Sequence, residues 1–277
     1  MSLLSVVRDR LHGDFLMRSR LDEYRRLLDE ALAAGYTISA VDRYWETIRA
    51  VPDGAERRWL VLRHDVDTDP GTAGALWAIE DERGITSSYF FRLATLDFEL
   101  MARIAERGGH VSYHYEELAE VAKRRPPAGG RAADLLPEAR DHFARHLERL
   151  RARTGLPMTV VASHGDFVNR RLGINNTAIL ADREFRAAVG VTLETYDTDF
   201  LATVTSYHRD LPYPAFWMHG DPHDAIARRE PRMYALIHPK PWRVNRRVNG
   251  RDNLVRAWQE LEWRLATRGG RRWDEPR

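Results

Sequence analysis

Short apolar runs alternate with amphipathic segments along most of the chain from residue 59 onward. The apolar runs have the length of buried strands, and the segments between them repeat apolar residues at helical spacing. The predicted strands are 59–67, 85–93, 109–116, 158–166, 192–197 and 233–237. The predicted helices are 72–84, 97–109, 117–124, 136–155, 183–191 and 252–270, and a Pro- and Gly-rich loop is predicted at 124–134. This alternation favours parallel strands joined by helical crossovers.

The pattern gives about six or seven strand–helix units, which is close to the number in an α/β barrel. An amphipathic helix is predicted ahead of them at 21–35, where it ends in a glycine. We therefore predict an N-terminal helical extension over residues 1–58 and an α/β barrel domain over 59–277. Asp69 and Asp252 precede helical segments and are predicted to cap them.

Composition narrows the possible chemistry. The 43 Lys and Arg residues nearly balance the 41 Asp and Glu residues, and 43% of the chain is apolar, as in a globular protein. Cysteine is absent, so any metal must be held by His, Asp or Glu. Arg8 interrupts the N-terminal apolar run, so we expect no signal peptide or membrane span and predict a cytoplasmic protein. Apart from a short basic tail at 268–273, no basic stripe is present, so we expect no nucleic-acid partner.

Polar side chains follow several predicted strands, at the edge where parallel α/β folds gather their reactive residues. Asp65 and Asp67 end the first of these strands, and His114, His164 and His238 follow others. Residues two apart on a strand face the same side, so the two carboxylates are expected to share one space. A lone aspartate at a strand end is often a helix cap, but the same residue types at four strand ends favour a functional site.

Carboxylates and imidazoles together suit metal-assisted hydrolysis. One carboxylate can hold a cation while the other takes a proton from water, whose pKa falls from about 15.7 towards about 7 on a divalent metal. Two imidazoles and one carboxylate make a zinc-type site with an open position.

Other histidines compete for these roles. His142 and His146 stand four apart on a predicted helix, but a phenylalanine takes the place of the glutamate that a metalloprotease helix needs, and we favour a solvated helix face. His219 and His223 lie in a loop whose role the sequence leaves open. His110 is expected to face away from His114.

The segments LRHDVD, SYFFRL, GGHVSYHYEEL, SHGD and LIHP, over roughly residues 59–242, resemble the polysaccharide deacetylase-like superfamily, also called carbohydrate esterase family four. The chain is similar to a divergent branch in which Arg-His-Asp-x-Asp replaces the usual Thr-Phe-Asp-Asp-Gly. The resemblance implies a distorted (β/α) barrel of about seven strand–helix units. It also implies a divalent-metal-dependent hydrolase that removes N- or O-acetyl groups from sugars.

The resemblance assigns roles to individual residues. Asp65 matches the family's general base, and His238 matches the late histidine that acts as general acid. His114 matches the first histidine of the metal-binding His-x-x-x-His. The family's metal-binding aspartate directly follows the base, where this chain has Val66, so Asp67 is expected to supply that ligand.

The second histidine of the family's pair falls at Leu118, which cannot bind a metal. His164, Glu116 or Glu117 remains as its replacement, and we favour His164 because it follows a strand end aimed at the same cleft. The glutamates are expected to begin a helix.

The predicted metal ligands are therefore Asp67, His114 and His164. Zinc is favoured as the metal, with cobalt or manganese as alternatives. The residues predicted to bind substrate are Arg63, Tyr115 and Trp242, the two aromatic rings by stacking on sugar faces.

The predicted substrate is an acetylated saccharide or a saccharide precursor, with a soluble or carrier-linked precursor preferred over a wall polymer. Two alternatives remain open. One is a barrel that has lost hydrolysis and binds a saccharide, which Val66 and Leu118 suggest. The other is a metal-dependent amidase acting on a small non-sugar amide. The sequence leaves the oligomeric state open.

Overall fold

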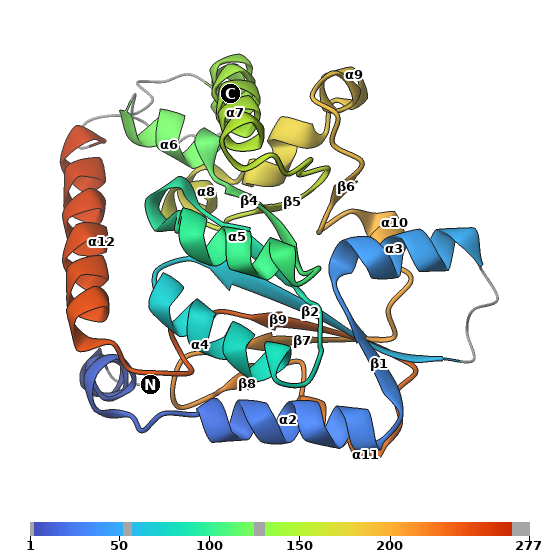
Figure 1. Cartoon of the computed structure of the whole chain (residues 1–277). Helices are drawn as coiled ribbons and strands as arrows, with labels where there is room; N and C mark the ends of the chain where they lie inside the picture. Colours follow the sequence, from blue (N-terminus) through green and yellow to red (C-terminus); the bar gives the residue numbers. More distant parts are fainter. Residues whose placement is uncertain (1–2, 52–56, 125–130, 268–277) are drawn as a thin grey trace. The chain divides into compact units, whose positions relative to one another are not determined.

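Figure 1 shows a computed structural model of the chain, which describes residues 3–51, 57–124 and 131–267. Most of the predicted loop at 124–134 and the basic tail at 268–273 lie outside the described residues. The chain divides into two compact units. Unit 1 comprises Met1–Ser112 and Asp197–Gly250, and unit 2 comprises Tyr113–Tyr196 and Arg251–Arg277.

Unit 1 contains the N-terminal helices and a mostly parallel sheet. Its elements are α1 Leu3–Leu11, η1 His12–Leu16, α2 Leu21–Ala33, β1 Tyr36–Ser39, α3 Val41–Ala50, β2 Arg58–Val66, α4 Pro70–Asp81, β3 Ser88–Phe91, η3 Leu93–Thr95, α5 Phe98–Glu106, α10 Thr198–Leu201, β7 Ser206–Asp210, β8 Trp217–Met218, α11 Pro222–Ala227 and β9 Arg232–Ile237. Strand β2 pairs in parallel with β1, β3 and β9, and β9 pairs in parallel with β7. Strand β8 pairs antiparallel with β7.

The core of unit 1 forms around β2, which is buried from Trp59 to Val66. Both faces of β2 are therefore buried, and this explains its almost continuous apolar run. Helix α2 packs on this core through residues at helical spacing, including Tyr24, Leu27 and Leu28, all fully buried. In Figure 1, α2 and α4 lie on the same face of β2 and β9.

Unit 2 carries the remaining strands and helices. They are α6 Glu117–Arg124, η4 Ala132–Leu135, α7 Leu136–Thr154, β5 Val160–Ser163, α8 Phe167–Leu172, η5 Asn176–Leu180, α9 Arg183–Ala188 and β6 Leu193–Glu194. Strand β4 (His110–Tyr115) and helix α12 (Arg246–Ala266) each begin in unit 1 and end in unit 2. Strand β5 pairs in parallel with β4 and with β6.

The predicted α/β class with parallel strands and helical crossovers is confirmed, and the order of elements is consistent with a distorted barrel preceded by helices. Strands β1 and β7 were not predicted. The boundary predicted at residue 59 stays a prediction, although β1 pairs with β2 ahead of it. Among the described residues, no helix is long and apolar enough to cross a membrane.

Two predicted helix caps have different outcomes. Asp69 caps α4 as predicted, because its side chain accepts the N–H of Thr72. The prediction for Asp252 is wrong, since α12 begins at Arg246 and Asp252 lies inside it, where it accepts from Arg256. The preceding Asn-Gly is unfavourable in an isolated helix. Here Asn249 is buried and donates to the carbonyl of Asp14, and this contact outweighs the low propensity.

Candidate active site

The carboxylate of Asp65 is held by a buried arginine on the same strand. Arg63 donates from Nε to Oδ1 and from Nη2 to Oδ2 of Asp65, at 2.7 Å each, and the two side chains are 0% and 2% exposed. Nη1 of Arg63 also donates to the hydroxyl of Tyr234 at 3.2 Å. A bidentate, charge-assisted pair of this kind favours the ionised carboxylate and fixes its orientation. The structure thus buries Arg63, predicted to bind substrate, and gives it the role of positioning Asp65.

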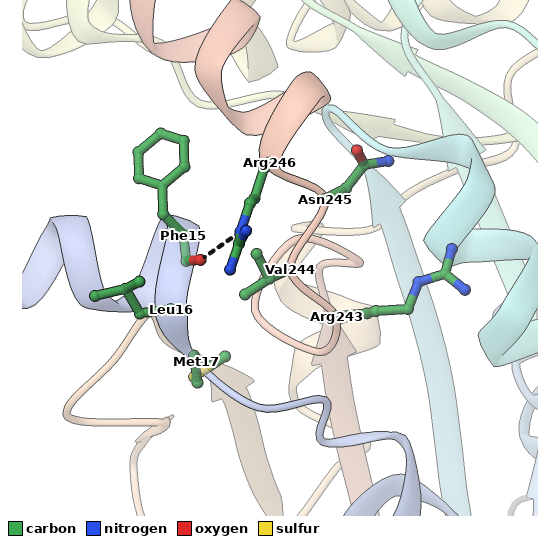
Figure 2. A pocket seen from close by; sticks show the side chains of 7 residues that line it. All are labelled: Phe15, Leu16, Met17, Arg243, Val244, Asn245 and Arg246. Carbon is green, nitrogen blue, oxygen red and sulfur yellow. Dashed lines mark hydrogen bonds between the residues drawn. The ribbon is translucent and has the colours of Figure 1, made fainter.

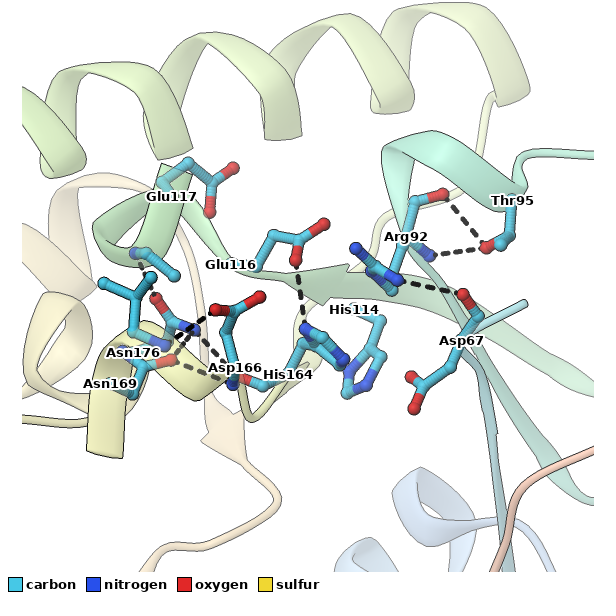
Figure 3. Close-up of polar contacts among 12 residues, drawn as sticks. Asp67, Arg92, Thr95, His114, Glu116, Glu117, His164, Asp166, Asn169 and Asn176 are labelled. Atoms are coloured by element: carbon cyan, nitrogen blue, oxygen red, sulfur yellow. Dashed lines mark hydrogen bonds and ion pairs between the residues drawn. The ribbon is translucent and has the colours of Figure 1, made fainter. Parts of the chain in front are cut away.

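Main-chain contacts hold the segment that carries Asp67. The Asp67 N–H donates to the carbonyl of Asp65 at 2.9 Å, and Thr95 Oγ1 donates to the carbonyl of Val66 at 2.6 Å. Arg92 donates from Nη1 to the Asp67 carbonyl at 2.9 Å, as Figure 3 shows. These contacts occupy backbone oxygens and fix the turn after β2.

His238 and Asp210 form an ion pair at the ends of β9 and β7. The His238 Nδ1–H donates to Asp210 Oδ1 at 2.6 Å, and the His238 backbone N–H donates to Oδ2 at 2.8 Å. Trp242 Nε1 also donates to Oδ2 at 2.8 Å. Asp210 therefore fixes the orientation of the His238 ring, whose side chain remains 22% exposed.

The charge state of His238 follows from its neighbours. Burial lowers the pKa of His238, but the charge and hydrogen bond of Asp210, with smaller contributions from Asp67 and Asp65, outweigh burial and raise the pKa from 6.5 to about 9. The imidazole therefore carries a proton at neutral pH. A protonated, oriented and partly exposed imidazole is a suitable general acid.

Sequence reasoning missed Asp210 because it missed β7. Three of the five residues of β7 are only partly buried, and the segment includes Ser206, His208 and Arg209, so no apolar run marks it. The signal that was present is at the start of the strand, where Val204 and Thr205 just before β7 and Tyr207 within it are residue types that favour strands.

In unit 2, His114 and His164 lie at the ends of the paired strands β4 and β5. Their ring centroids are 5.3 Å apart. His114 Nδ1–H donates to the carbonyl of Ala162 at 2.9 Å, and His164 Nδ1–H donates to Glu116 Oε2 at 3.0 Å. The backbone N–H of His164 donates to the Tyr115 carbonyl at 2.8 Å, which extends the strand pairing to this residue.

These contacts set the tautomers of both rings. In His114 and in His164 the Nδ1 proton is donated to an oxygen, so Nε2 is the nitrogen that carries the lone pair. Metal-ligating histidines usually have this arrangement, with the other ring nitrogen donating to a carbonyl or a carboxylate. The two rings thus have the chemistry of metal ligands, and Glu116 has that of a carboxylate that orients one of them.

Two asparagines hold the loop after His164, as Figure 3 shows. Asn176 is 1% exposed, donates to the His164 carbonyl at 2.6 Å and accepts the Ala119 N–H at 3.1 Å. Asn169 Oδ1 accepts the Asp166 N–H at 3.0 Å and a proton from Asn176 at 3.1 Å. The backbone beside His164 is therefore fixed by side chains that the sequence analysis did not single out.

A second combination of ligands is present in the same place. Glu116, His164 and Asp166 are buried and each offers a ligand atom within 4.8 Å of the others. Asp166 is already engaged, because Oδ1 accepts the Val168 N–H at 2.9 Å and Oδ2 accepts from Lys123 Nζ at 2.6 Å. A metal here would compete with an ammonium group and a helix cap for the oxygens of Asp166.

Glu117, an alternative ligand in the sequence analysis, belongs to a different network. Its Oε1 accepts from the hydroxyl of Tyr113 and, at 2.9 Å, from Nδ1 of His146. His146 is only 18% exposed, so the solvated helix face predicted for it is wrong. Leu118 is fully buried in the core.

Burial corrects the predicted stacking on sugar faces. Tyr115 and Trp242 are both 0% exposed, so neither ring offers a face to a ligand in this structure. Tyr115 packs edge-on against Phe143 with ring centroids 5.0 Å apart, and Trp242 donates to Asp210. Both rings complete the core, and Trp242 also contributes to the setting of His238.

The two histidines left open by the sequence lie in unit 1. His223 donates from Nδ1 to Glu30 Oε2 at 2.5 Å and so connects α11 with α2. His219 lies beside Tyr207, with ring centroids 5.8 Å apart. Within the described part of the chain, neither histidine has a hydrogen bond or a ring contact with a predicted site residue.

The structure thus brings the predicted residues together in two groups. Asp65, Asp67 and His238 belong to unit 1, and His114 and His164 belong to unit 2. The predicted three-ligand set draws on both units and stays a prediction.

Unit 1 also contains a cavity of about 590 Å³, drawn in Figure 2. Arg246 Nε donates to the Phe15 carbonyl at its edge, and Arg243 donates to Thr72. None of the predicted site residues lines this cavity. Its lining residues are Phe15, Leu16, Met17, Arg243, Val244, Asn245 and Arg246.

No protein-family model and no curated protein matches the chain. Among solved structures, the peptidoglycan deacetylase PdaC from Bacillus subtilis and a point mutant of it match with TM-scores of 0.33 each and identities of 13% and 12%. Both matches cover 75% of this chain and 86% of the other. A mutant CE4 family pseudoenzyme with restored enzymatic activity matches at a TM-score of 0.37 and 12% identity, covering 73% of this chain and 62% of the other.

The pseudoenzyme is of the CE4 family, which is the family that the sequence motifs resemble.

Proposed function

We propose that this protein is a metal-dependent hydrolase that removes acetyl groups from acetylated saccharides or saccharide precursors. The observation that carries the proposal is the state of His114 and His164. Both rings donate Nδ1–H to an oxygen, as metal-ligating histidines do, and their ring centroids lie 5.3 Å apart.

In this proposal His114 and His164 hold a divalent metal, and Asp67 is the third ligand. Two imidazoles and one carboxylate suit zinc, and the same nitrogen and oxygen donors also suit cobalt or manganese. The metal supplies Lewis-acid polarisation of the acetyl carbonyl and a lowered pKa for water.

Asp65 has the features required of the proton acceptor. Its carboxylate is kept in one orientation by Arg63 at 2.7 Å, so it need not reorganise during the reaction. In the proposed reaction the oxygen of water attacks the acetyl carbonyl carbon, and the proton released passes to Asp65.

His238 supplies the second proton transfer. When the bond between the acetyl carbon and the sugar nitrogen or oxygen breaks, the leaving group takes the proton that His238 carries. The products are acetate and a free amine or hydroxyl. A binding protein needs neither a proton acceptor nor a protonated donor, so the Asp65 and His238 arrangements favour catalysis over a lapsed barrel.

Metal analysis tests the ligand assignment. We expect about one divalent metal per chain in wild type after loading with zinc, cobalt or manganese, and its loss in His114→Ala and in His164→Ala. Asp166→Asn should retain the metal, because Asp166 is engaged by Lys123. His223→Ala is the matched control, since this histidine contacts Glu30 instead.

Two results would contradict the assignment. If the wild-type protein takes up no metal, the proposed mechanism is wrong and the saccharide-binding alternative remains. Loss of metal in Asp166→Asn with retention in His114→Ala would place the cation on Glu116, His164 and Asp166 instead.

Acetate release tests the reaction itself. We expect the metal-loaded protein to release acetate from N- or O-acetylated oligosaccharides, and Asp65→Asn to lose this activity while it keeps its metal. If the protein hydrolyses small non-sugar amides and releases no acetate from the oligosaccharides, it is an amidase and not a saccharide deacetylase.

A further inference from the structure

Two arginines line the cavity of unit 1, and neither is paired with an acid. Each is held through its Nε atom, Arg246 by the Phe15 carbonyl at 3.0 Å and Arg243 by the Thr72 hydroxyl at 3.2 Å. Among the residues that the structure describes, no carboxylate forms an ion pair with either arginine, and no acceptor takes a hydrogen bond from their Nη atoms. Both side chains are thus fixed in place while their Nη groups remain available to a ligand.

The two guanidinium groups lie at different walls of the cavity. Arg246 extends towards η1 and Arg243 towards the first turn of α4, as Figure 2 and their hydrogen bonds show. The two Nη atoms of a guanidinium form a planar fork that matches two oxygens of a phosphate. A ligand that uses both arginines therefore needs two linked anionic groups.

The rest of the lining is mostly apolar. It consists of Phe15, Leu16, Met17, Val244 and the amide of Asn245. The cavity volume of about 590 Å³ lies within the range of about 300–1,000 Å³ that small-molecule sites have, and it is larger than two phosphate groups need. The cavity is therefore suited to a ligand in which an anionic portion continues into an apolar or aromatic one.

The acids on the adjoining segments are engaged elsewhere. Asp69 accepts from the Thr72 hydroxyl at 2.6 Å and from the Asn245 amide at 3.3 Å. Asp14 lies 3.4 Å from the ammonium group of Lys240. Since no acid is present in the lining itself, positive charge is in excess around the cavity, and an anionic ligand is favoured.

The lining residues are connected to both segments of unit 1 that carry the proposed reacting groups. Asn245 donates to Asp69, which follows Asp67 by two residues. The lining segment 243–246 also begins directly after Trp242, whose indole donates to the carboxylate that orients His238. A ligand anchored in the cavity is thus held by the same segments that hold these two groups.

We propose that this cavity binds a diphosphate group, and that the substrate is an acetylated sugar joined through a diphosphate to a nucleoside or a lipid. Arg243 and Arg246 each hold one phosphate, and the apolar wall receives the group beyond the diphosphate. Naming this substrate class rests on the proposed hydrolase function, whereas the binding of a diphosphate does not.

Calorimetry on the full chain in the presence of a chelator tests the cavity separately from catalysis. We expect uridine diphosphate or geranyl diphosphate to bind, and uridine and geraniol to bind at least about 100-fold more weakly. The diphosphate that binds more tightly identifies the remainder of the ligand as a nucleoside or a lipid.

Arginine variants test the assignment to this cavity. Arg243→Gln and Arg246→Gln should each weaken diphosphate binding at least about 10-fold, because each removes charge-assisted hydrogen bonds. Arg247→Gln is the matched control and should bind like wild type, since Arg247 is an exposed neighbour that does not line the cavity. Val244→Trp fills the cavity while it keeps both arginines, and it should also weaken binding. Urea unfolding checks that each variant is folded.

Acetate release tests the substrate class. The metal-loaded protein should show a kcat/KM at least about 10-fold higher for an N-acetylated sugar linked to uridine diphosphate or geranyl diphosphate than for the free N-acetylated sugar. Arg243→Gln and Arg246→Gln should raise the KM of the diphosphate-linked sugar and leave that of the free sugar unchanged.

Several outcomes would overturn the proposal. Failure of both diphosphates to bind removes it whether or not the protein releases acetate, as does equal binding of uridine and uridine diphosphate. A loss of binding in Arg247→Gln equal to that in Arg243→Gln and Arg246→Gln would place the ligand outside the cavity. Equal kcat/KM for free and diphosphate-linked sugars would overturn the substrate class. Diphosphate binding that depends on both arginines, without acetate release from any sugar, would support the cavity assignment and remove the hydrolase function.

Discussion

His238 owes its proton to Asp210, and this dependence can be measured through stability. The folded-state pKa of about 9 lies above the ordinary 6.5, so the pair contributes stability in full below about pH 6.5 and loses it as pH rises towards 9. We expect Asp210→Asn to lower the free energy of unfolding on the order of 2–3 kcal/mol at pH 6, and by progressively less up to pH 9.5. Urea unfolding of both proteins across this pH range measures the difference.

The same variant should change activity in a direction that separates charge from simple loss of fold. Without the carboxylate, the pKa of His238 falls, and the alkaline limb of the pH–rate profile should move to lower pH. Asp141→Asn, at an exposed position on α7, is the control and should leave the limb in place. An unmoved limb in Asp210→Asn would show that His238 does not supply the proton.

Glu116 gives a second prediction at the scale of the residue. If it orients His164 without binding the metal, Glu116→Gln should weaken metal affinity by about 10- to 100-fold without removing the metal. Glu117→Gln is the matched control, because its neighbours are Tyr113 and His146. Titration of the apoprotein with zinc measures both affinities, and equal losses in the two variants would contradict the orienting role.

At this scale the sequence makes the candidate site residues conspicuous, but not the side chains that hold them in place. Asp65, His164 and His238 stand out because polar residues at the ends of apolar runs are conspicuous. Asp210 and Asn176 are not conspicuous, because their importance comes from a hydrogen bond to a residue distant in the chain.

At the scale of the element, the N-terminus of α4 fixes the chain just beyond Asp67. Asp69 is 2% exposed, accepts the Thr72 hydroxyl at 2.6 Å and the Asn245 side-chain amide at 3.3 Å. We expect Asp69→Ala to lower the free energy of unfolding by about 1–2 kcal/mol, as losses of helix caps do. Urea unfolding with an unchanged m-value measures this loss. Asp97 caps α5 by accepting the Leu100 N–H, so Asp97→Ala should lower the free energy of unfolding by less than Asp69→Ala does. An equal loss would contradict a stabilising role for the Thr72 hydroxyl and Asn245 contacts of Asp69.

Helices and strands with a strong apolar pattern were predicted correctly, and those that are formed by tertiary contacts were missed. Helix α2 was predicted from its apolar stripe, and β2 from its continuous apolar run. Strand β7 was missed because it is partly polar and is stabilised by pairing with β9. The first turns of α12 were missed because they contain an Asn-Gly pair, which is held in the helix by the contact of Asn249 with Asp14.

At the scale of the whole molecule, the N-terminal residues are part of the core of unit 1. The hydroxyl of Tyr24 donates to the buried Glu80, which also accepts from Ser87 at 2.5 Å and lies 2.7 Å from His64 Nε2. Burial raises the pKa of Glu80, but the charge and hydrogen bond of His64, with further hydrogen bonds, outweigh it and lower the pKa. The carboxylate is therefore ionised in the core, where these donors stabilise it.

We accordingly expect a fragment of residues 59–277 not to fold alone. The fragment lacks α2, so the core of unit 1 is uncovered and Glu80 loses the hydrogen bond donated by Tyr24. Circular dichroism and urea unfolding of residues 59–277 test this. In the full chain, Tyr24→Phe should be folded but less stable by about 1–3 kcal/mol. A cooperative, fully stable 59–277 fragment would restore the sequence-based boundary.

The pairing of β4 with β5 has a consequence for how this chain can vary. In the resembled motif the two histidines are four residues apart, so any insertion between them destroys the pair. Here His114 and His164 are 50 residues apart in sequence, and their spacing in space is set by the register in which His114 pairs with Ala162. Insertions and deletions in the connection between these strands are therefore compatible with an intact histidine pair, provided that the register is kept. Homologous chains are accordingly better sought by a histidine at each of two adjacent strand ends than by a fixed spacing.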